Sequence, residues 1–216
     1  MSESNNNSTD DAQNTPTREV AKRVSARELA ESTYSFKESD EDRAAQYTLF
    51  PTGGRANRIA IVGTLTDSDV RTTDDGKELV SGRVNDGDMD FLVNAPPFEP
   101  GAVADMKKLS PPCYVTIVGK LDHREYQGEH YVNVRIESVQ EVSEADRDRW
   151  LMEMAEQTLD RIEAMNAAAA GGESTPDIQR AQEQYDVDIT EILNGLRSSF
   201  DSVFSVSPDV PEEMQD

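Results

Sequence analysis

Two segments of this chain lack acidic residues, although the chain as a whole is strongly acidic. The sequence has 43 Asp and Glu among 216 residues, so a segment of 24 residues would hold about five. Residues 43–66 and residues 106–121 hold none, and they carry six cations, Arg43, Arg55, Arg58, Lys107, Lys108 and Lys120. Such side chains bind the phosphates of nucleic acids. If the two segments meet in the fold, they form a positive track for a single strand; otherwise they are buried strands that hold few charges.

Aromatic rings would supply the other half of such a site, because every base has a face that can stack on Phe, Tyr or Trp. Tyr131 has the opposite parity from Val132 and is expected to face outward, and Tyr126 is expected to be exposed in a loop. Phe91 shares its parity with Met89, which favours the core, but it remains a candidate. The predicted nucleic-acid-binding residues are Arg55, Arg58, Arg83, Phe91, Lys120, Arg124, Tyr126, Tyr131 and Arg135.

Five short strand-like runs would position these residues. The fifth run alternates apolar with polar residues, as a strand with one buried face does. Gly63 lies inside the first run, where a strand must bend around a barrel corner. Asn85–Asp88 predicts a tight turn after the second run, and Gly101–Leu109 can form a short helix after the third. The runs are Ile59–Thr66, Leu79–Asn85, Met89–Ala95, Tyr114–Asp122 and Tyr131–Val139.

This chain order is that of an OB-fold, a small Greek-key barrel that often binds oligonucleotides. The predicted fold is therefore mainly β with α, a five-stranded OB-fold barrel preceded by an N-terminal helix and followed by two or three C-terminal helices. Two loops close over oligonucleotides in this fold. The loop that holds Arg124 and Tyr126 suits that role. The loop Asp67–Glu78 holds five acidic residues, which argue against tight binding of an oligonucleotide.

The pattern divides the chain into five regions: 1–16, a disordered polar tail; 17–42, an N-terminal helix and acidic connector; 43–142, the OB-fold domain; 143–204, a helical region with a flexible joint near 167–175; and 205–216, a second disordered tail. The N-terminal helix is predicted over Thr17–Glu31, although Ser25 and Glu28 form a second possible capping box that would break it.

Two C-terminal helices have strong local signals. Ser143 and Asp146 form a capping box for the first helix. The last helix has a broad apolar face that includes Ile192, Leu196 and Phe200. Such a face packs either on its own chain or on another protein, so these three residues are the predicted protein-interaction site.

The kinds of charged residue, and their distribution, decide what the net charge of −22 implies about binding partners. Six of the 21 basic residues are Lys and the other 15 are Arg, and the acids are scattered along the whole chain. This composition is typical of salt-accumulating halophiles, where net charge governs solubility rather than the choice of partner. The alternative is an acidic mimic or a disordered activator.

Catalytic and metal-binding signals are weak. Cys113 is the only cysteine, which excludes an internal disulfide and a multi-cysteine zinc site. His123 and His130 could form a metal site with two nearby glutamates, but incidental ligands in a hairpin loop are favoured. Without a glycine-rich phosphate loop or a nucleophile elbow, the chain is predicted to be no enzyme and to use no cofactor. It has no apolar run of the ~20 residues that span a bilayer, so a soluble cytoplasmic protein is expected.

Three segments carry a resemblance to a known family. Arg55–Leu65, after Leu49–Gly53 and preceded by Tyr34–Asp40, resembles the replication protein A-associated proteins of haloarchaea. The run from Arg83 to Gly87, with Phe91 and Val93, is similar to the second-to-third-strand signature of replication protein A-type OB-folds. The resemblance extends from about residue 18 through the final helix.

The resemblance implies a single-stranded DNA-binding complex in DNA replication and repair, in which the family member is bound to replication protein A. The chain departs from the signature at four positions, with Asp88 and Met89 where Thr-Gly is usual, and Leu92 and Asn94 where aromatic residues are frequent. These departures favour a subunit that needs its partner. The alternative is a pure protein-interaction subunit with no direct DNA contact.

Overall fold

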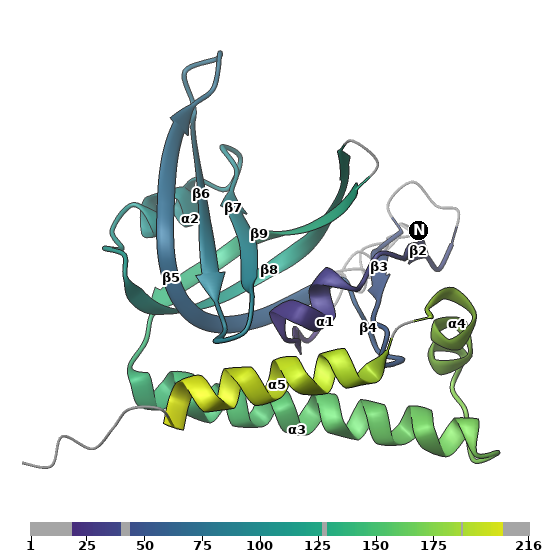
Figure 1. Cartoon of the computed structure of the whole chain (residues 1–216). Helices are drawn as coiled ribbons and strands as arrows, with labels where there is room; N and C mark the ends of the chain where they lie inside the picture. Colours follow the sequence, from purple (N-terminus) through teal and green to yellow (C-terminus); the bar gives the residue numbers. More distant parts are fainter. Residues whose placement is uncertain (1–18, 40–43, 127–128, 187, 205–216) are drawn as a thin grey trace, which may run out of the picture.

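The structure is a computed structural model of the chain. It describes residues 19–39, 44–126, 129–186 and 188–204, and at residues 124–126, 129, 130 and 204 it describes the backbone alone. A barrel stands on a layer of helices, with a small three-stranded sheet at one side (Figure 1). The two predicted tails lie outside the described residues. Within these ranges, no helix has the length and apolar character needed to cross a membrane.

The barrel has the strand order predicted for an OB-fold. Its strands are β5 (Arg58–Thr72), β6 (Glu78–Asn85), β7 (Asp90–Ala95), β8 (Cys113–Tyr126) and β9 (Glu129–Glu141). They pair in the order β5-β6-β7-β9-β8, and β8 pairs with β5 to close the barrel. Among these five strands, only the β7–β9 pairing is parallel. The helix α2 (Pro100–Met106) lies between β7 and β8 in the chain, as predicted, and the OB-fold is confirmed.

The long strand β5 pairs with two neighbours in turn. Residues 58–65 pair with β8 and residues 64–72 pair with β6, with a bulge between Leu65 and Asp67. Gly63 lies next to the crossover, and a Cβ atom there would clash with the carbonyl oxygen of Asn85. The glycine predicted at a barrel corner therefore permits the close approach of β6.

The acidic segment Asp67–Glu78 is mostly strand, which corrects the predicted loop. β5 continues to Thr72, and only residues 73–77 connect it to β6. Residues 67–72 of β5 and 78–83 of β6 project from the barrel as a two-stranded arm (Figure 1). Most side chains of the arm are exposed, so its strands can consist largely of polar residues. One cross-strand pair on the arm is Asp69 with Ser81.

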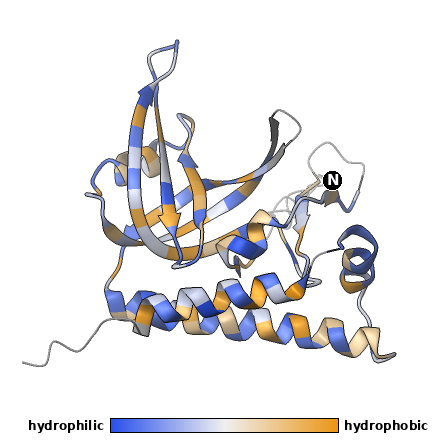
Figure 2. Cartoon of the chain, viewed as in Figure 1, coloured by the Kyte–Doolittle hydropathy of each residue, from blue (hydrophilic) through white to orange (hydrophobic). Residues whose placement is uncertain are grey.

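Inward-facing side chains from all five strands fill the barrel. Apolar and polar residues alternate along the strands (Figure 2), as a barrel with a packed interior requires. Met106 of α2 is buried in the same core, and Trp150 and Leu151 of α3 (Glu144–Ala169) join it from the helical layer. The largest buried side chains of the barrel strands are Ile59, Ile61, Leu65, Phe91, Ile117 and Ile136.

Two helices, α3 and α5 (Ile189–Phe204), lie side by side beneath the barrel (Figure 1). The capping box predicted for α3 is present, because Ser143 Oγ accepts a hydrogen bond from Asp146 N and the Asp146 carboxylate accepts one from Ser143 N. The Asp146 carboxylate also accepts a hydrogen bond from the Ser143 hydroxyl over 2.6 Å, and this bond, with the one from Ser143 N, lowers the pKa of Asp146. After α3, Gly171 adopts φ +90°, and Thr175 caps α4 (Pro176–Gln184).

The apolar face of α5 packs on its own chain. Ile192 and Leu196 are buried, and Phe200 is half-buried against the core. α5 contacts both α3 and α1. In this structure the three residues predicted to bind another protein therefore face their own chain, and an apolar stripe has the same sequence pattern in both cases.

The N-terminal helix is much shorter than predicted. Lys22–Arg23 forms β1, which pairs parallel with β5, and α1 covers only Ala26–Ala30. Ser25 caps α1 by accepting a hydrogen bond from Glu28 N. Ser25 alone therefore ends the longer predicted helix as an N-cap, because the Glu28 side chain binds Thr52 and Arg161 and does not complete the predicted capping box.

Glu28 is completely buried in a polar network that joins α1 to α3. Its carboxylate accepts hydrogen bonds from Thr52 Oγ1 and, over 2.7 Å, from Arg161 Nη2. Arg161 Nε also donates to Thr52 Oγ1 over 2.9 Å, and Arg161 Nη2 donates to Thr158 Oγ1. The network holds the N-terminal segment against the helical layer.

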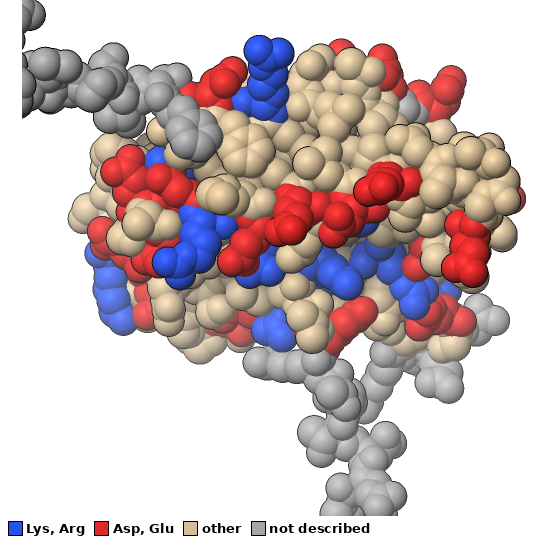
Figure 3. Space-filling view, turned by 90° about the horizontal axis from the view of Figure 1, so that it is seen from below, with Lys and Arg blue, Asp and Glu red and all other residues tan. Residues whose placement is uncertain are grey.

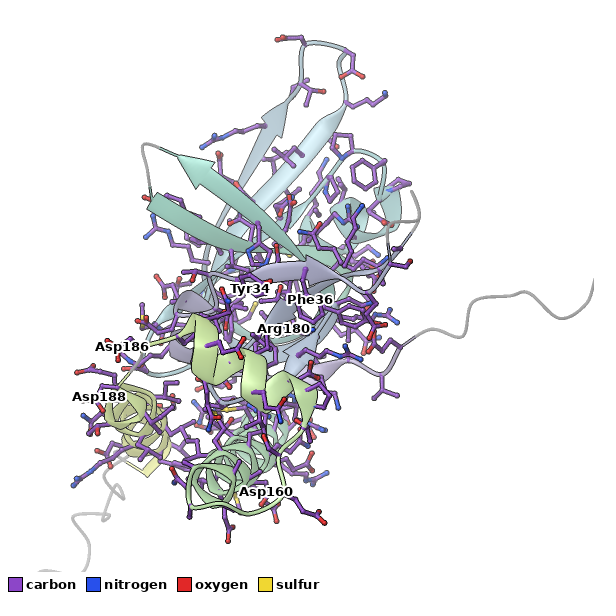
Figure 4. The ribbon with its side chains drawn as sticks, turned by 90° about the vertical axis from the view of Figure 1, so that its right-hand side faces the viewer. Tyr34, Phe36, Asp160, Arg180, Asp186 and Asp188 are labelled. Atoms are coloured by element: carbon purple, nitrogen blue, oxygen red, sulfur yellow. The ribbon has the colours of Figure 1, made fainter. Side chains whose placement is uncertain are left out.

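A satellite sheet was missed by the sequence pattern. It consists of β2 (Ser35–Lys37), β3 (Gln46–Leu49) and β4 (Arg55–Ala56) in the order β2-β3-β4. Phe36 stacks on Tyr34 and Tyr47, and Arg180 of α4 lies over the Phe36 ring at 4.1 Å (Figure 4). Tyr185 fixes the end of α4 to the sheet, because its hydroxyl donates to Leu49 O and accepts from Tyr34 N.

Candidate nucleic-acid interface

The outer face of β6, β7 and β9 carries three rows of paired residues, which we call the groove face. The middle row joins Arg83, Leu92 and Asn133, and the row beside it joins Ser81, Asn94 and Arg135. On the other side, Asn85 pairs with Asp90, and Tyr131 follows the outward parity of β9. In an OB-fold this is the surface that holds oligonucleotides.

Two hollows adjoin on the groove face, because Arg83 and Leu92 line both of them. One, of about 550 Å³, extends toward α1 and includes Tyr131 and Asp90. The other, of about 360 Å³, extends toward the arm and includes Asn94. The concave surface is therefore continuous from α1 to the arm.

Two exposed aromatic rings lie near this face. Tyr131 is 42% exposed and Phe98 is 66% exposed. The guanidinium of Arg135, in the row with Ser81 and Asn94, lies 5.5 Å from the centre of the Phe98 ring. Phe98 was missed because it belongs to no strand; an aromatic residue directly after Pro96-Pro97 was the available signal, since such a segment cannot join the sheet. Both rings offer stacking surface for bases.

The charge on the groove face is mixed rather than positive. Arg83 has a 61% exposed side chain, and its Nη1 lies 4.0 Å from Asp90. Asp67 and Asp69 line the hollow near the arm, where Asp69 accepts a hydrogen bond from Arg71. A phosphate would therefore bind beside carboxylates, so stacking must supply a large share of any affinity.

The two acid-free segments pair along β5 and β8 from Arg58–Lys120 to Leu65–Cys113, but among the described residues their cations meet only at the Arg58–Lys120 pair. Arg58 pairs with Lys120 across β5 and β8, and Lys120 pairs with Arg135 across β8 and β9. Arg58 is engaged by Glu137 at 2.5 Å and its side chain is mostly buried. Of this cross-strand row, Lys120 is the exposed member. The described cations of the two segments therefore form no continuous positive track, which was one of the two alternatives.

Other cations of the two segments are also engaged by acids. Arg55 belongs to the satellite sheet, where it pairs with Glu38 and Asp177 and lies over the Tyr47 ring. Arg55 was predicted to bind nucleic acid, but it lies on this satellite sheet and not on the groove face. Lys107 pairs with Glu78 and Lys108 pairs with Asp105. Arg43 lies outside the described residues.

Phe91 cannot stack a base in this structure. It is 2% exposed and belongs to the barrel core, as its parity with Met89 favoured. Arg124 and Tyr126 are at the end of β8, and their side chains lie outside what the structure describes. The predicted residues that the groove face brings together are therefore Arg83, Tyr131 and Arg135, with Lys120 on the neighbouring strand.

The turn between β6 and β7 anchors one wall of the groove. Asp86 is buried, and its carboxylate accepts hydrogen bonds from the backbone N–H groups of Ala26, Asp88 and Met89. Burial raises the pKa of Asp86, against the opposite effect of these donors. Arg27 of α1 binds Asp88 through two hydrogen bonds of 2.7 and 3.1 Å. These contacts fix α1 at the edge of the larger hollow.

The same turn carries α5 on its other side. Gly87 adopts φ +99°, and a Cβ atom there would lie 2.9 Å from the Ser199 backbone. A Cβ atom at Gly195 would lie 2.6 Å from Asp88 Oδ2 and 2.9 Å from the Arg27 side chain. Both glycines permit close packing, so the turn, α1 and α5 form one unit behind the groove wall.

Comparisons with known proteins give partial similarities. No protein-family model and no curated protein matches the chain. A structure of the Stn1–Ten1 complex of S. pombe is similar at 18% identity and TM-score 0.45, over 54% of this chain and 81% of that chain. A replication protein A heterotrimer bound to ssDNA is similar at 12% identity and TM-score 0.43, over 66% and 98%. The second single-stranded DNA-binding protein of Mycobacterium smegmatis is similar at 25% identity and TM-score 0.34, over 40% and 87%.

Proposed function

We propose that this protein binds single-stranded DNA through the groove face and acts as an accessory subunit with replication protein A in DNA replication and repair. The observation that carries the proposal is the pair of exposed rings, Tyr131 and Phe98, beside one concave OB-fold surface that also presents Arg83 and Arg135. The family resemblance of the sequence supports the association with replication protein A.

The arrangement suits a short stretch of extended strand. Tyr131 and Arg135 are four residues apart on β9, so their Cα atoms are separated by about 13 Å. Bases stack on Tyr131 at one end and on Phe98 at the other, where Arg135 already lies over the ring. Arg83 and Lys120 are exposed and bind phosphates.

Fluorescence anisotropy of a labelled oligonucleotide at high salt, with the purified protein alone, tests the proposal. Tyr131→Ala and Phe98→Ala should each weaken binding about 5- to 150-fold, because loss of one stacked base costs about 1–3 kcal/mol. Met152→Ala, which removes an exposed apolar side chain on α3, is the matched control and should bind as the wild type does. No binding by the wild type at micromolar concentration would refute direct contact.

The second candidate is a protein-interaction subunit that never touches DNA. Two observations favour it: the groove face carries carboxylates beside its cations, and Met152 and Leu159 are exposed seven residues apart on α3. Figure 3 views the helical layer from below and shows a band of acidic side chains across it, a surface that suits a protein better than a phosphate backbone.

A pull-down with replication protein A separates the two candidates. For the interaction subunit, Met152→Asp with Leu159→Asp should abolish capture, whereas Tyr131→Ala should leave it intact. Leu196→Asp is unsuitable as a test, because Leu196 is buried and its replacement by a charge would unfold the helical layer. Capture that survives the double α3 variant would exclude this surface.

A further inference from the structure

The larger hollow of the groove face is a slot with two unlike walls. Leu29 and Ala30 of α1, with Leu92 and Val132, supply apolar surface, and the Tyr131 ring lies beside them. Asn85, Asp90 and Arg83 supply the polar wall. At about 550 Å³, the slot lies in the size range of sites for small planar ligands. One base of a bound strand therefore fits between α1 and β9.

Asp90 is the carboxylate of this slot that can accept further hydrogen bonds. It lies on the outer face of β7, where its Oδ1 accepts a hydrogen bond from Asn85 Nδ2 over 2.8 Å. Its Oδ2 lies 4.0 Å from Arg83 Nη1, which is beyond hydrogen-bond length. Asp88, the other carboxylate in the lining, already binds Arg27 with both of its oxygens.

An ionised carboxylate only accepts hydrogen bonds, so it selects bases by the donors on their edges. Guanine presents two neighbouring donors, N1–H and the 2-amino group, and cytosine presents its 4-amino group. Thymine presents a single N3–H between two carbonyl oxygens, which the carboxylate repels. The Arg83 guanidinium lies 4.0 Å from Asp90, so it can donate a hydrogen bond to the O6 of the same guanine.

We infer that Asp90 makes this slot a base-selective subsite that prefers guanine, and amino-bearing bases in general, over thymine. The inference rests on the proposed function, since it concerns one position of the bound strand. It also sets this protein apart from binders whose modest preferences come from stacking and backbone flexibility alone.

The test uses a 12-nucleotide thymine strand in which one guanine is moved through every position. At one position, guanine should tighten binding by the wild type about tenfold, in line with a bidentate base contact. Inosine at that position, which lacks only the 2-amino group, should lose most of the gain. Asp90→Asn should remove the preference and leave affinity for the all-thymine strand equal or higher, because a negative charge near phosphates has been removed.

Asp69→Asn is the matched control. It removes a carboxylate from the same groove face but outside the slot, so the guanine preference should persist. Thymine strands that bind while guanine gives no gain at any position would overturn the inference and leave the proposed function standing. A preference that survives Asp90→Asn would overturn it as well. Absence of binding to every strand would overturn the proposed function and the inference together.

Discussion

Removal of Arg161 should destabilise the protein more than removal of any exposed arginine of α3. Arg161 is the positive partner of Glu28, whose side chain is 0% exposed. Arg161→Met keeps an apolar chain of similar length but leaves this carboxylate buried beside Thr52 without a counter-charge. Breaking one side of a buried pair costs about 3–5 kcal/mol. For a chain of this size, that corresponds to a fall in Tm of about 6–20 °C.

Urea unfolding can measure this change through the only tryptophan of the chain. Trp150 is buried in α3, so its fluorescence reports loss of the packing between the helical layer and the barrel. Arg149→Met, on the exposed side of the same helix, is the control and should change stability by less than about 0.5 kcal/mol.

A double variant separates the charge from the packing. Glu28→Gln combined with Arg161→Met removes both charges, so it should be no less stable than Arg161→Met alone. If the losses of stability in Glu28→Gln and in Arg161→Met add up to the loss in the double variant, the two charges are not coupled. A loss below about 1 kcal/mol in Arg161→Met would likewise refute the account of Glu28 as a buried, compensated carboxylate.

Three further results are expected. Gly63→Ala should destabilise the barrel by about 1–3 kcal/mol, because the added Cβ would clash with Asn85 O. Thermal unfolding followed by circular dichroism measures this loss, and Gly101→Ala, where the added Cβ meets open space, is the control that should show none. Burial raises the pKa of Tyr185 to about 12, so this phenol ionises at lower pH in the unfolded chain than in the folded protein. As the pH rises from about 10 to about 12, urea titrations should show the free energy of unfolding of the wild type falling relative to that of Tyr185→Phe. The logarithm of the DNA association constant should fall with the logarithm of salt concentration with a slope of about −2 or shallower, since Arg83, Arg135 and Lys120 are the cations proposed to bind phosphates, whereas Arg71 in the same face is bound to Asp69. A slope near −5 would contradict the mixed charge described for the groove face.

Alternation and turn chemistry sufficed to predict the barrel, because its strands each bury one face. The capping box at Ser143 was equally readable from local sequence. The satellite sheet was not, since its strands have only two to four residues and show no usable alternation. The extension of β5 was missed because a projecting arm needs no apolar face.

The site was harder to predict than the fold because ion pairs join residues that are distant in the sequence. Arg55 and Arg58 lie in a segment without acids, yet Asp177 and Glu137 reach them from other elements. The composition of a segment does not reveal ion-pair partners that come from other parts of the sequence. Tyr131, in contrast, was placed correctly by its parity, since outward position in a strand is a local property.

The contact of α5 with the β6–β7 turn bears on the order in which the molecule is completed during synthesis. Residues 58–141 hold every strand of the barrel, and they leave the ribosome before residues 189–204 of α5. Yet α1, which walls the slot, is bound to Asp88 on one side and contacts α5 on the other. Domains form from the N-terminus as the chain emerges. A nascent barrel can therefore close while the slot beside α1 still lacks the support of α5, and the groove wall is completed only when the last helix docks.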